Sequence, residues 1–426
     1  MSPEPQRLFA RGSGVGVVDT AASRFTFASS VLIEATWPAR RTLARVTVID
    51  VSGWAAGDDD TTFEASGVQA LVREDAVVVL RARRDLVVEI EGAFSAAYRG
   101  HRRGNWLLRD PEGGLGLHPL RARRARKTRF RDDGFELAYA LRAGEELWIA
   151  AYPTRLPDAT RERQRIAHEG RPHPFPGAAY PADELIAAAG QHCDVFALHA
   201  YFWNAVPPER RPKLGRYAGR RCSWLTPQHE PELPSEFERV TRTVAASGMD
   251  LVVYLSPLHS QAPDVRAEVR RVLETYPVQG LYLDGVARDL VELHSLVRDI
   301  RGLLGPDRIL YLNASNEPFR SVRAFCPFID AYADFVLRGD AGRGGLALDR
   351  FLQYAVSGRG GSNAVGLWCH YTSSGRVVPL ERVPTTAHIE AAGRHGARLW
   401  RRSIWERGGG ELERFERDIA RVSGES

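Results

Sequence analysis

The chain contains 426 residues, a length that favours two or three domains. Its hydrophobic fraction of 44% and charged fraction of 26% are those of a globular protein and exclude a disordered chain. The net charge of +5 is modest and comes almost entirely from arginine, so it gives little reason to expect an acidic partner.

Residues 1–155 are predicted to form an antiparallel β-sandwich. Short runs of β-branched and aromatic residues recur here, and turn-forming clusters such as Gly57-Asp58-Asp59-Asp60 separate them. No long segment has the periodicity of a helix. The predicted strands are Val15–Val18, Val31–Thr36, Val46–Val51, Val77–Ala82, Leu86–Ile90, Phe135–Leu141 and Leu147–Tyr152.

Residues 156–176, rich in Arg, Pro and His, are predicted to be a linker. In residues 177–426 apolar strands alternate with amphipathic helices. The predicted helices are Pro181–Gly190, Pro234–Ser247, Asp264–Tyr276, Asp289–Leu304, Arg320–Cys326, Leu346–Ser357 and Glu411–Val422. The predicted strands are Val195–Phe202, Leu251–Leu255, Gly280–Leu283, Ile309–Leu312, Ile329–Leu337 and Ala364–His370.

This alternation predicts a parallel sheet covered by helices. The helix Asp289–Leu304 has one apolar face to pack on a sheet, and Gly305-Pro306 should end it. A doubly wound sheet would carry a Gly-rich loop after its first strand, whereas His199–Asn204 contains no glycine. We therefore expect a multidomain chain of mixed α and β structure, with an N-terminal antiparallel β-sandwich and a C-terminal (β/α)8-like TIM barrel.

Functional side chains of such a barrel lie at the carboxyl ends of its strands. Asp284 follows the predicted strand Gly280–Leu283 directly, and Gly285 after it lets the chain turn sharply. Capping of the next helix is the alternative role for this carboxylate, but Asp289 lies closer to that helix. Asp284 is therefore the principal candidate for a catalytic carboxylate.

Cleavage of a glycosidic bond needs two carboxyl groups, one that attacks or stabilises the sugar cation and one that protonates the leaving oxygen. Asp284 as nucleophile with Asp340 as acid/base is the preferred pair. A surface turn is the alternative interpretation of Asp340. The other acids that could contribute are Asp330, Asp334 and Glu317.

Aromatic and polar side chains near the strand ends favour a sugar ligand. Aromatic rings stack on the C–H faces of sugars and polar groups bind their hydroxyls, although a single ring is more often core packing. The predicted substrate-binding residues are His199, Tyr201, Trp203, His259, Tyr282, Asn313, Glu317, Arg338, Trp368 and His370.

Three segments carry a family resemblance: Leu147–Thr154, the GLYLDG string Gly280–Gly285, and Pro327–Tyr332 running on to Asp340. They resemble bacterial (β/α)-barrel glycoside hydrolases with an N-terminal β-sandwich, near the family 123 β-N-acetylgalactosaminidases. The resemblance implies a strand-end Asp at Asp284, whereas Asp340 stands where the relatives have Glu. Family 123 enzymes use an adjacent Asp-Glu pair, but Asp183-Glu184 lies in a predicted helix, so that mechanism is not expected here.

No motif indicates a metal or a cofactor. The segment His168–His173 has the wrong spacing for the H-E-x-x-H zinc motif, and the four cysteines form no C-x-x-C pair. The basic run Arg121–Arg131 favours a solvated strand or loop over a nucleic-acid site. No metal, cofactor or nucleic-acid partner is therefore expected.

The sequence has no apolar run of about 18 residues and no apolar core near its N-terminus. We therefore expect a cytoplasmic protein without a membrane partner, and a carbohydrate as the substrate. Its oligomeric state is not predicted. The alternatives to hydrolysis are a non-catalytic carbohydrate-binding barrel and a sugar lyase or isomerase that uses His199, His259 or His370 as base.

Overall fold

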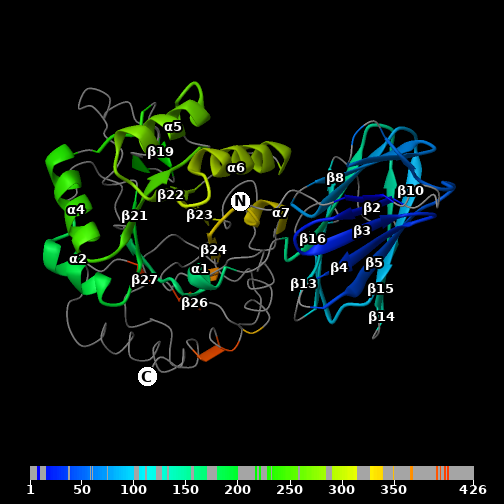
Figure 1. Cartoon of the computed structure of the whole chain (residues 1–426), viewed down its shortest axis with the longest axis horizontal. Helices are drawn as coiled ribbons and strands as arrows, with labels where there is room; N and C mark the ends of the chain where they lie inside the picture. Colours follow the sequence, from blue (N-terminus) through cyan, green and yellow to red (C-terminus); the bar gives the residue numbers. More distant parts are fainter. Residues whose placement is uncertain are drawn as a thin grey trace. The chain divides into compact units, whose positions relative to one another are not determined.

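The computed structural model describes most of residues 16–199 and 228–338 and short stretches elsewhere, with larger gaps at 100–104, 121–126, 170–179, 285–289 and 314–326. The chain divides into two compact units (Figure 1). Unit 1 contains residues 1–158, 323–331 and 357–362, and unit 2 contains residues 159–322, 332–356 and 363–426. Among the described residues, no helix has the length and apolar character that crossing a membrane requires.

Unit 1 contains two antiparallel sheets of eight strands each, as the many short predicted strands indicate. The first sheet has the order β1 (Arg7–Phe9), β2 (Gly16–Asp19), β3 (Ser23–Phe27), β4 (Val31–Ala35), β5 (Arg41–Val48), β10 (Leu86–Gly92), β15 (Gly134–Leu141) and β14 (Lys127–Arg131). The second has the order β11 (Ala96–Arg99), β12 (Trp106–Asp110), β13 (Gly113–Leu120), β16 (Glu146–Tyr152), β9 (Val77–Ala82), β8 (Val68–Arg73), β7 (Thr62–Ala65) and β6 (Ala55–Ala56).

The two sheets of unit 1 share one hydrophobic core. Along β3 and β8, buried residues alternate with partly exposed ones, which is the pattern of strands with one face turned inward. Phe27 of β3 stacks on Phe63 of β7 with ring centroids 3.9 Å apart. Burial of these apolar faces is the main term that stabilises the unit.

Strand β16 is buried along nearly its whole length, and a short helix of unit 1 packs against it. This helix is α7 (Pro327–Asp330), and its Phe328 ring lies 5.2 Å from the ring of Trp148 on β16. The Phe328 ring also meets His118 of β13 edge to face at 5.2 Å. Burial lowers the pKa of His118 to about 3, so the imidazole is neutral in the folded protein.

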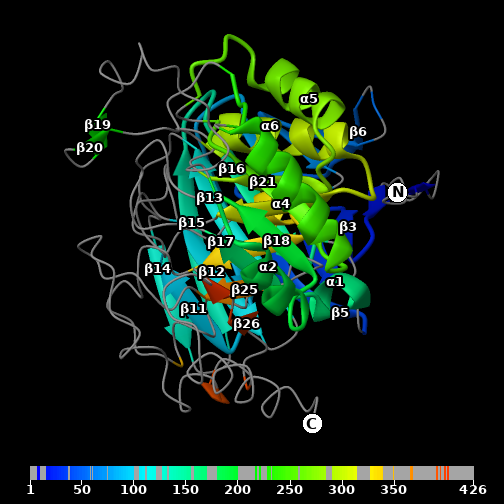
Figure 2. The same cartoon turned by 90° about the vertical axis from the view of Figure 1, so that its left-hand side faces the viewer.

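The main sheet of unit 2 is parallel, with its strands paired in parallel throughout. Its order is β26 (Arg398–Leu399), β25 (Val365–Leu367), β24 (Phe335–Arg338), β23 (Ile309–Asn313), β22 (Gly280–Leu283), β21 (Asp250–Leu255), β18 (Val195–Leu198), β17 (Ile166–Glu169) and β27 (Arg401–Arg402). A separate antiparallel pair joins β19 (Arg216–Tyr217) and β20 (Arg220–Arg221). Figures 1 and 2 show the parallel sheet curling, with helices along its outer side.

Two features of this sheet were not predicted. The segment expected to be a linker, residues 156–176, contains α1 (Ala159–Arg163) and β17, which pairs in parallel with β18. In addition, the two edges of the strand order, β26 and β27, are separated in the sequence by a single residue, Trp400. One short stretch of chain therefore pairs with β25 on one side and with β17 on the other.

Four described helices of unit 2 agree closely with the periodicity: α2 (Asp183–Gly190), α4 (Pro234–Ala246), α5 (Val265–Thr275) and α6 (Leu290–Leu304). Asp264 caps α5, since its side chain accepts a hydrogen bond from the backbone N–H of Arg266 at 2.9 Å. α6 ends at Gly305, whose φ of +67° suits glycine. The predicted helices Arg320–Cys326, Leu346–Ser357 and Glu411–Val422 lie outside the described residues, apart from Asp349.

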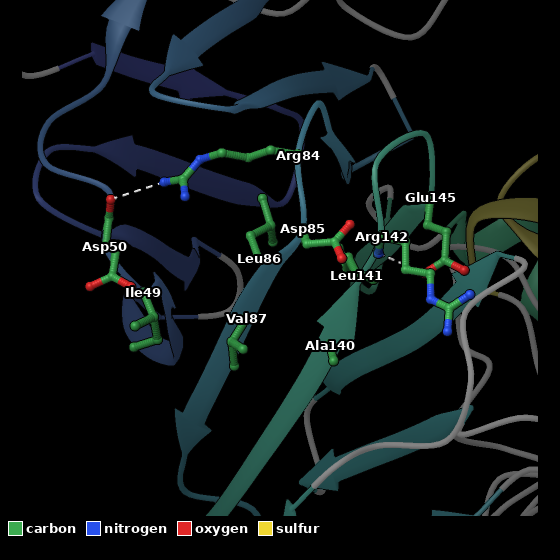
Figure 3. Close-up of a pocket in the computed structure, with 10 residues that line it drawn as sticks. All are labelled: Ile49, Asp50, Arg84, Asp85, Leu86, Val87, Ala140, Leu141, Arg142 and Glu145. Carbon is green, nitrogen blue, oxygen red and sulfur yellow. Dashed lines mark hydrogen bonds between the residues drawn. The ribbon is translucent and has the colours of Figure 1, made fainter.

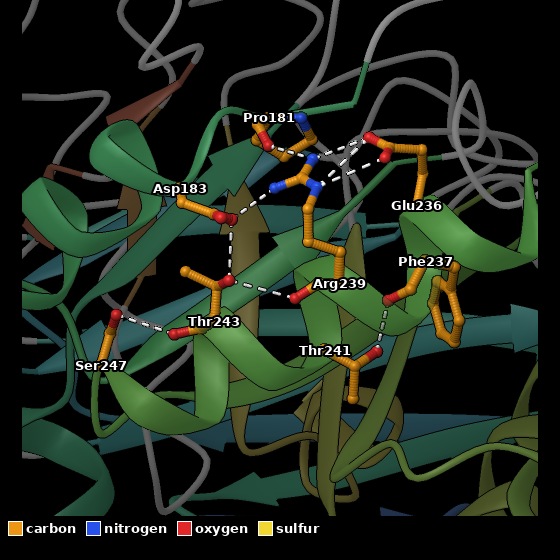
Figure 4. A network of polar contacts seen from close by, with 8 residues as sticks. All are labelled: Pro181, Asp183, Glu236, Phe237, Arg239, Thr241, Thr243 and Ser247. Carbon is orange, nitrogen blue, oxygen red and sulfur yellow. Dashed lines mark hydrogen bonds and ion pairs between the residues drawn. The ribbon is translucent and has the colours of Figure 1, made fainter.

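Arg239 of α4 joins α4 to α2 (Figure 4). It donates hydrogen bonds to Asp183, to Glu236 at 2.8 Å and to the carbonyl oxygen of Pro181 at 2.7 Å. The hydrogen bond from Thr243 and the ion pair with Arg239 lower the pKa of Asp183. Asp183, the first member of the adjacent Asp-Glu pair, is therefore engaged between two helices.

Close packing between β22 and β23 depends on Gly280. A Cβ atom at this position would lie 2.2 Å from the carbonyl oxygen of Ile309, far inside van der Waals contact. Only a residue without a side chain fits this approach. Gly280 thus sets the spacing of the strand that ends next to Asp284.

Candidate functional site

Four polar residues lie at the carboxyl ends of the central parallel strands. His199 follows β18, Ser256 follows β21, Asp284 follows β22, and Asn313 ends β23. These four strands are neighbours in the sheet, in the order β18, β21, β22 and β23. Parallel strands present their carboxyl ends at one edge, so these residues share that edge.

Strand register arranges these side chains in two rows. Tyr254 pairs with Tyr282 and Tyr282 with Tyr311, so three tyrosines lie side by side on β21, β22 and β23. Since side chains alternate along a strand, the residues two positions further on point to the same face. Those residues are Ser256, Asp284 and Asn313, which form a polar row above the tyrosine row.

The tyrosine row is a packed aromatic layer. The rings of Tyr282 and Tyr311 stack with centroids 4.3 Å apart, and Tyr254 meets Tyr282 edge to face at 5.6 Å. The His199 ring extends the layer, 4.5 Å from Tyr254. All four side chains are buried, so this layer supports the polar row from below.

Tyrosine hydroxyls connect the two rows. The hydroxyl of Tyr254 donates to Oδ2 of Asp284 at 3.4 Å, and Nδ2 of Asn313 donates to the hydroxyl of Tyr282 at 3.3 Å. In each contact a polar side chain meets a tyrosine on the neighbouring strand. The backbone N–H of Asp284 donates to the carbonyl oxygen of Leu255 at 3.1 Å, which continues the pairing of β21 and β22 to this residue.

Asp284 differs from its neighbours in exposure. Its side chain is half-buried, whereas Ser256 and Asn313 are buried. A carboxylate that is fixed on one side and reaches solvent on the other can contact a ligand. It can serve there as a nucleophile, as a base or as a charge that stabilises a cation.

The other acids proposed for this region behave differently. Asp334 precedes β24 and lies at the opposite, amino end of that strand. Its Oδ2 accepts hydrogen bonds from Arg301 and from the backbone N–H of Leu310, each at 2.8 Å. Asp330 is buried at the end of α7, although the strand predicted over Ile329–Leu337 should have included it. Neither of these two carboxylates joins the row of Asp284.

Arg338 is the last residue of β24, so its backbone ends at the same edge of the sheet. The remaining predicted site residues fall outside the described part of the chain. They are Asp340, Tyr201, Trp203, His259, Glu317, Trp368 and His370. Tyr254 was not predicted as a site residue, because a tyrosine in the middle of an apolar strand resembles an ordinary core residue.

A polar cluster of His229, Glu268 and Arg271 holds the end of the segment that connects β18 to α4. Arg271 donates to the carbonyl oxygen of His229 at 2.7 Å and to Glu268 at 2.8 Å. Although burial alone would raise the pKa of Glu268, hydrogen bonds from Arg271 and from the side chain and backbone of His229 lower it to about 2. Glu268 is therefore ionised, and the cluster anchors the chain just before α4 to α5.

Within the described residues, no group of three or more His, Cys, Asp or Glu side chains is placed to hold a metal ion. Unit 1 contains a pocket of about 430 Å³ on the residues shown in Figure 3. Arg84 and Asp85 on its rim are held by turn contacts, since Arg84 donates to the carbonyl oxygen of Asp50 at 3.2 Å and Asp85 accepts from the N–H of Ala143 at 3.1 Å. None of the predicted site residues lines this pocket.

Comparisons with known proteins give remote similarities. No protein-family model matches the chain, and no curated protein matches it. A glycoside hydrolase family 5 enzyme from Prevotella bryantii B14 is 11% identical, with a TM-score of 0.37 over 62% of this chain and 96% of that one. An α-amylase from Lactobacillus plantarum is 9% identical, with a TM-score of 0.43 over 62% and 81%. The α-L-fucosidase isoenzyme 2 of Paenibacillus thiaminolyticus is 11% identical, with a TM-score of 0.38 over 61% and 48%.

Proposed function

We propose that this protein is a glycoside hydrolase, which cleaves an O-glycosidic bond of an oligosaccharide, a polysaccharide or a glycoconjugate with Asp284 as one of two catalytic carboxylates. The observation that carries the proposal is the position of Asp284. It is a half-exposed carboxylate directly after a central parallel strand, in one row with Ser256 and Asn313. In barrels of parallel strands, catalytic residues come from these strand ends.

The proposal includes closure of the parallel sheet into a (β/α)8 barrel. Residues 398–402 pair with β25 through β26 and with β17 through β27. Counted as one strand, this stretch would join the two edges and complete a ring of eight. A closed ring brings the ends of non-adjacent strands to face each other, as a two-carboxylate mechanism requires.

The second carboxylate is proposed to be Asp340, two residues after the end of β24. β24 and β22 are separated in the sheet only by β23. A distance of about 5–5.5 Å between the carboxyl groups would make the enzyme retaining, with Asp284 as nucleophile, and about 6.5–9.5 Å would make it inverting. Glu317, after β23, is the alternative acid.

Sugar binding is proposed to use residues around this edge. Asn313 lies at the end of β23, next to β22, and Tyr282 supports it from below, whereas His199 follows β18, on the far side of β21. The other proposed contacts are Tyr201, Trp203, His259, Arg338, Trp368 and His370. We also propose that the two sheets of unit 1 form a β-sandwich, as expected from the sequence.

A panel of aryl glycosides and natural oligosaccharides tests the proposal. We expect hydrolysis of at least one substrate by the full chain and loss of turnover by at least about a thousandfold in Asp284→Asn, because the amide cannot act as nucleophile or base. Asp264→Asn is the matched control, since asparagine also caps helices well, and it should keep full activity. Turnover by folded Asp284→Asn equal to that of the control would refute the role of Asp284.

One observation favours a second candidate, a sugar lyase or isomerase. The imidazole of His199 packs 4.5 Å from Tyr254, whose hydroxyl contacts Asp284, so a potential base lies at the same edge. The products distinguish the two reactions. Hydrolysis in H₂¹⁸O places one heavy oxygen in the product, whereas elimination gives an unsaturated sugar without it. Binding of sugars without any turnover would instead favour a non-catalytic barrel.

A further inference from the structure

Tyr254 holds a fixed position next to Asp284. Its side chain is 2% exposed and contacts His199 on one side and Tyr282 on the other, with ring centroids 4.5 Å and 5.6 Å away. A buried ring in close packing cannot swing its hydroxyl away without displacing its neighbours. The hydroxyl oxygen is therefore kept 3.4 Å from Oδ2 of Asp284.

The direction of this hydrogen bond follows from chemistry. An ionised carboxylate can only accept, and a phenol hydroxyl carries a proton to donate, so Tyr254 donates to Asp284. The same diagonal contact recurs one strand further along, where Asn313 meets the hydroxyl of Tyr282 at 3.3 Å. The tyrosine row thus presents hydroxyl groups toward the polar row above it.

We infer that Tyr254 is a positioning residue, whose hydroxyl holds the carboxylate of Asp284 in one orientation and favours its ionised form. Hydrogen bonds to the charged form of an acid stabilise that form. The inference rests on the proposed function for its role in turnover, because a nucleophile must be ionised and aimed at the substrate. The contact itself is present without substrate, so it can be measured without knowing the sugar.

The test compares Tyr254→Phe with Tyr311→Phe in the full chain. Both substitutions remove one oxygen from a buried ring of the same row, but Tyr311 lies on β23 and stacks on Tyr282. Aspartate labelled with ¹³C at the side-chain carboxyl reports the titration of Asp284, and Asp284→Asn assigns its signal. We expect the titration midpoint to rise by about half a pH unit in Tyr254→Phe and to stay unchanged in Tyr311→Phe.

An unchanged midpoint in Tyr254→Phe, or an equal shift in both variants, overturns the inference. Thermal unfolding of each variant verifies that the fold is retained. Once a hydrolysed glycoside has been identified, its kinetics give a second test. Tyr254→Phe should lower kcat several-fold with little change in KM, because the substrate does not touch the buried ring. If Asp284→Asn keeps its activity, the proposed function fails, but the titration still decides whether Tyr254 acts on Asp284.

Discussion

Acid should lower the free energy of unfolding of unit 1, because protonation of a buried histidine in its interior is strongly unfavourable. His118 lies on β13 against Phe328 of α7, and burial lowers its pKa from 6.5 to about 3. In the unfolded chain the same imidazole titrates near 6.5. Between these two values the unfolded chain binds one proton more than the folded protein. The free energy of unfolding must therefore fall as the pH drops below about 6.5.

The two pKa values set the size of this effect. Each unit of difference corresponds to about 1.4 kcal/mol, so the histidine costs about 2 kcal/mol of stability at about pH 5 relative to about pH 8. The loss should continue down to about pH 3, where the folded protein takes up the proton as well. Other groups also titrate in this range, so a variant without the imidazole is needed to isolate the contribution.

His118→Phe is that variant, because its ring can keep the edge-to-face contact with Phe328. Urea unfolding of both proteins between about pH 5 and pH 8, followed by the fluorescence of tryptophans such as Trp148, gives the free energy at each pH. We expect the stability of the natural chain relative to the variant to fall by about 2 kcal/mol across this range. Parallel pH profiles, or a folded His118 that titrates near 6.5 by NMR, would refute the reasoning.

Two further predictions concern unit 2. Gly280→Ala should destabilise unit 2 by about 2 kcal/mol or more, because the new Cβ clashes with a backbone carbonyl. The control is Gly302→Ala, where the added Cβ meets open space, and it should be neutral or stabilising by about 0.5 kcal/mol. Equal melting temperatures of the two variants would contradict this. Asp334→Ala should cost about 3 kcal/mol, because it removes the carboxylate that pairs with Arg301, which is only 15% exposed, and that accepts from the backbone N–H of Leu310. The control, Glu91→Ala in unit 1, breaks an ion pair exposed by more than half and should cost below about 0.5 kcal/mol. Similar losses by denaturant titration would show that burial does not set the difference.

Much of unit 2 could be predicted because its signals are local. Gly280–Leu283 was predicted with the observed bounds, and α6 ends at Leu304 as expected. Strand β17 was missed, since Ile166–Glu169 has only two apolar residues within a polar stretch. A strand was predicted to begin at Ile329, but Ile329 belongs to α7, where contacts of Phe328 with a distant strand outweigh local propensity.

The candidate site was predictable only in part. Asp284 could be found because a carboxylate after an apolar strand and before a glycine is a local pattern. The place of Tyr254 beneath it depends on the register between β21 and β22, which no single segment encodes. Likewise Asp334 looked like a candidate acid until its partner Arg301, more than 30 residues away, was known.

The pairing of β17 with β27 has a consequence for biosynthesis. Ala167 lies next to Arg401, although more than half of the chain separates them. During synthesis β17 has no neighbour on that side until residues 401 and 402 have emerged from the ribosome. Until then the nascent sheet offers unpaired backbone groups to other chains. A ribosome that stalls before residue 398 would therefore release a product prone to aggregate, and chaperones should be needed until that point in translation.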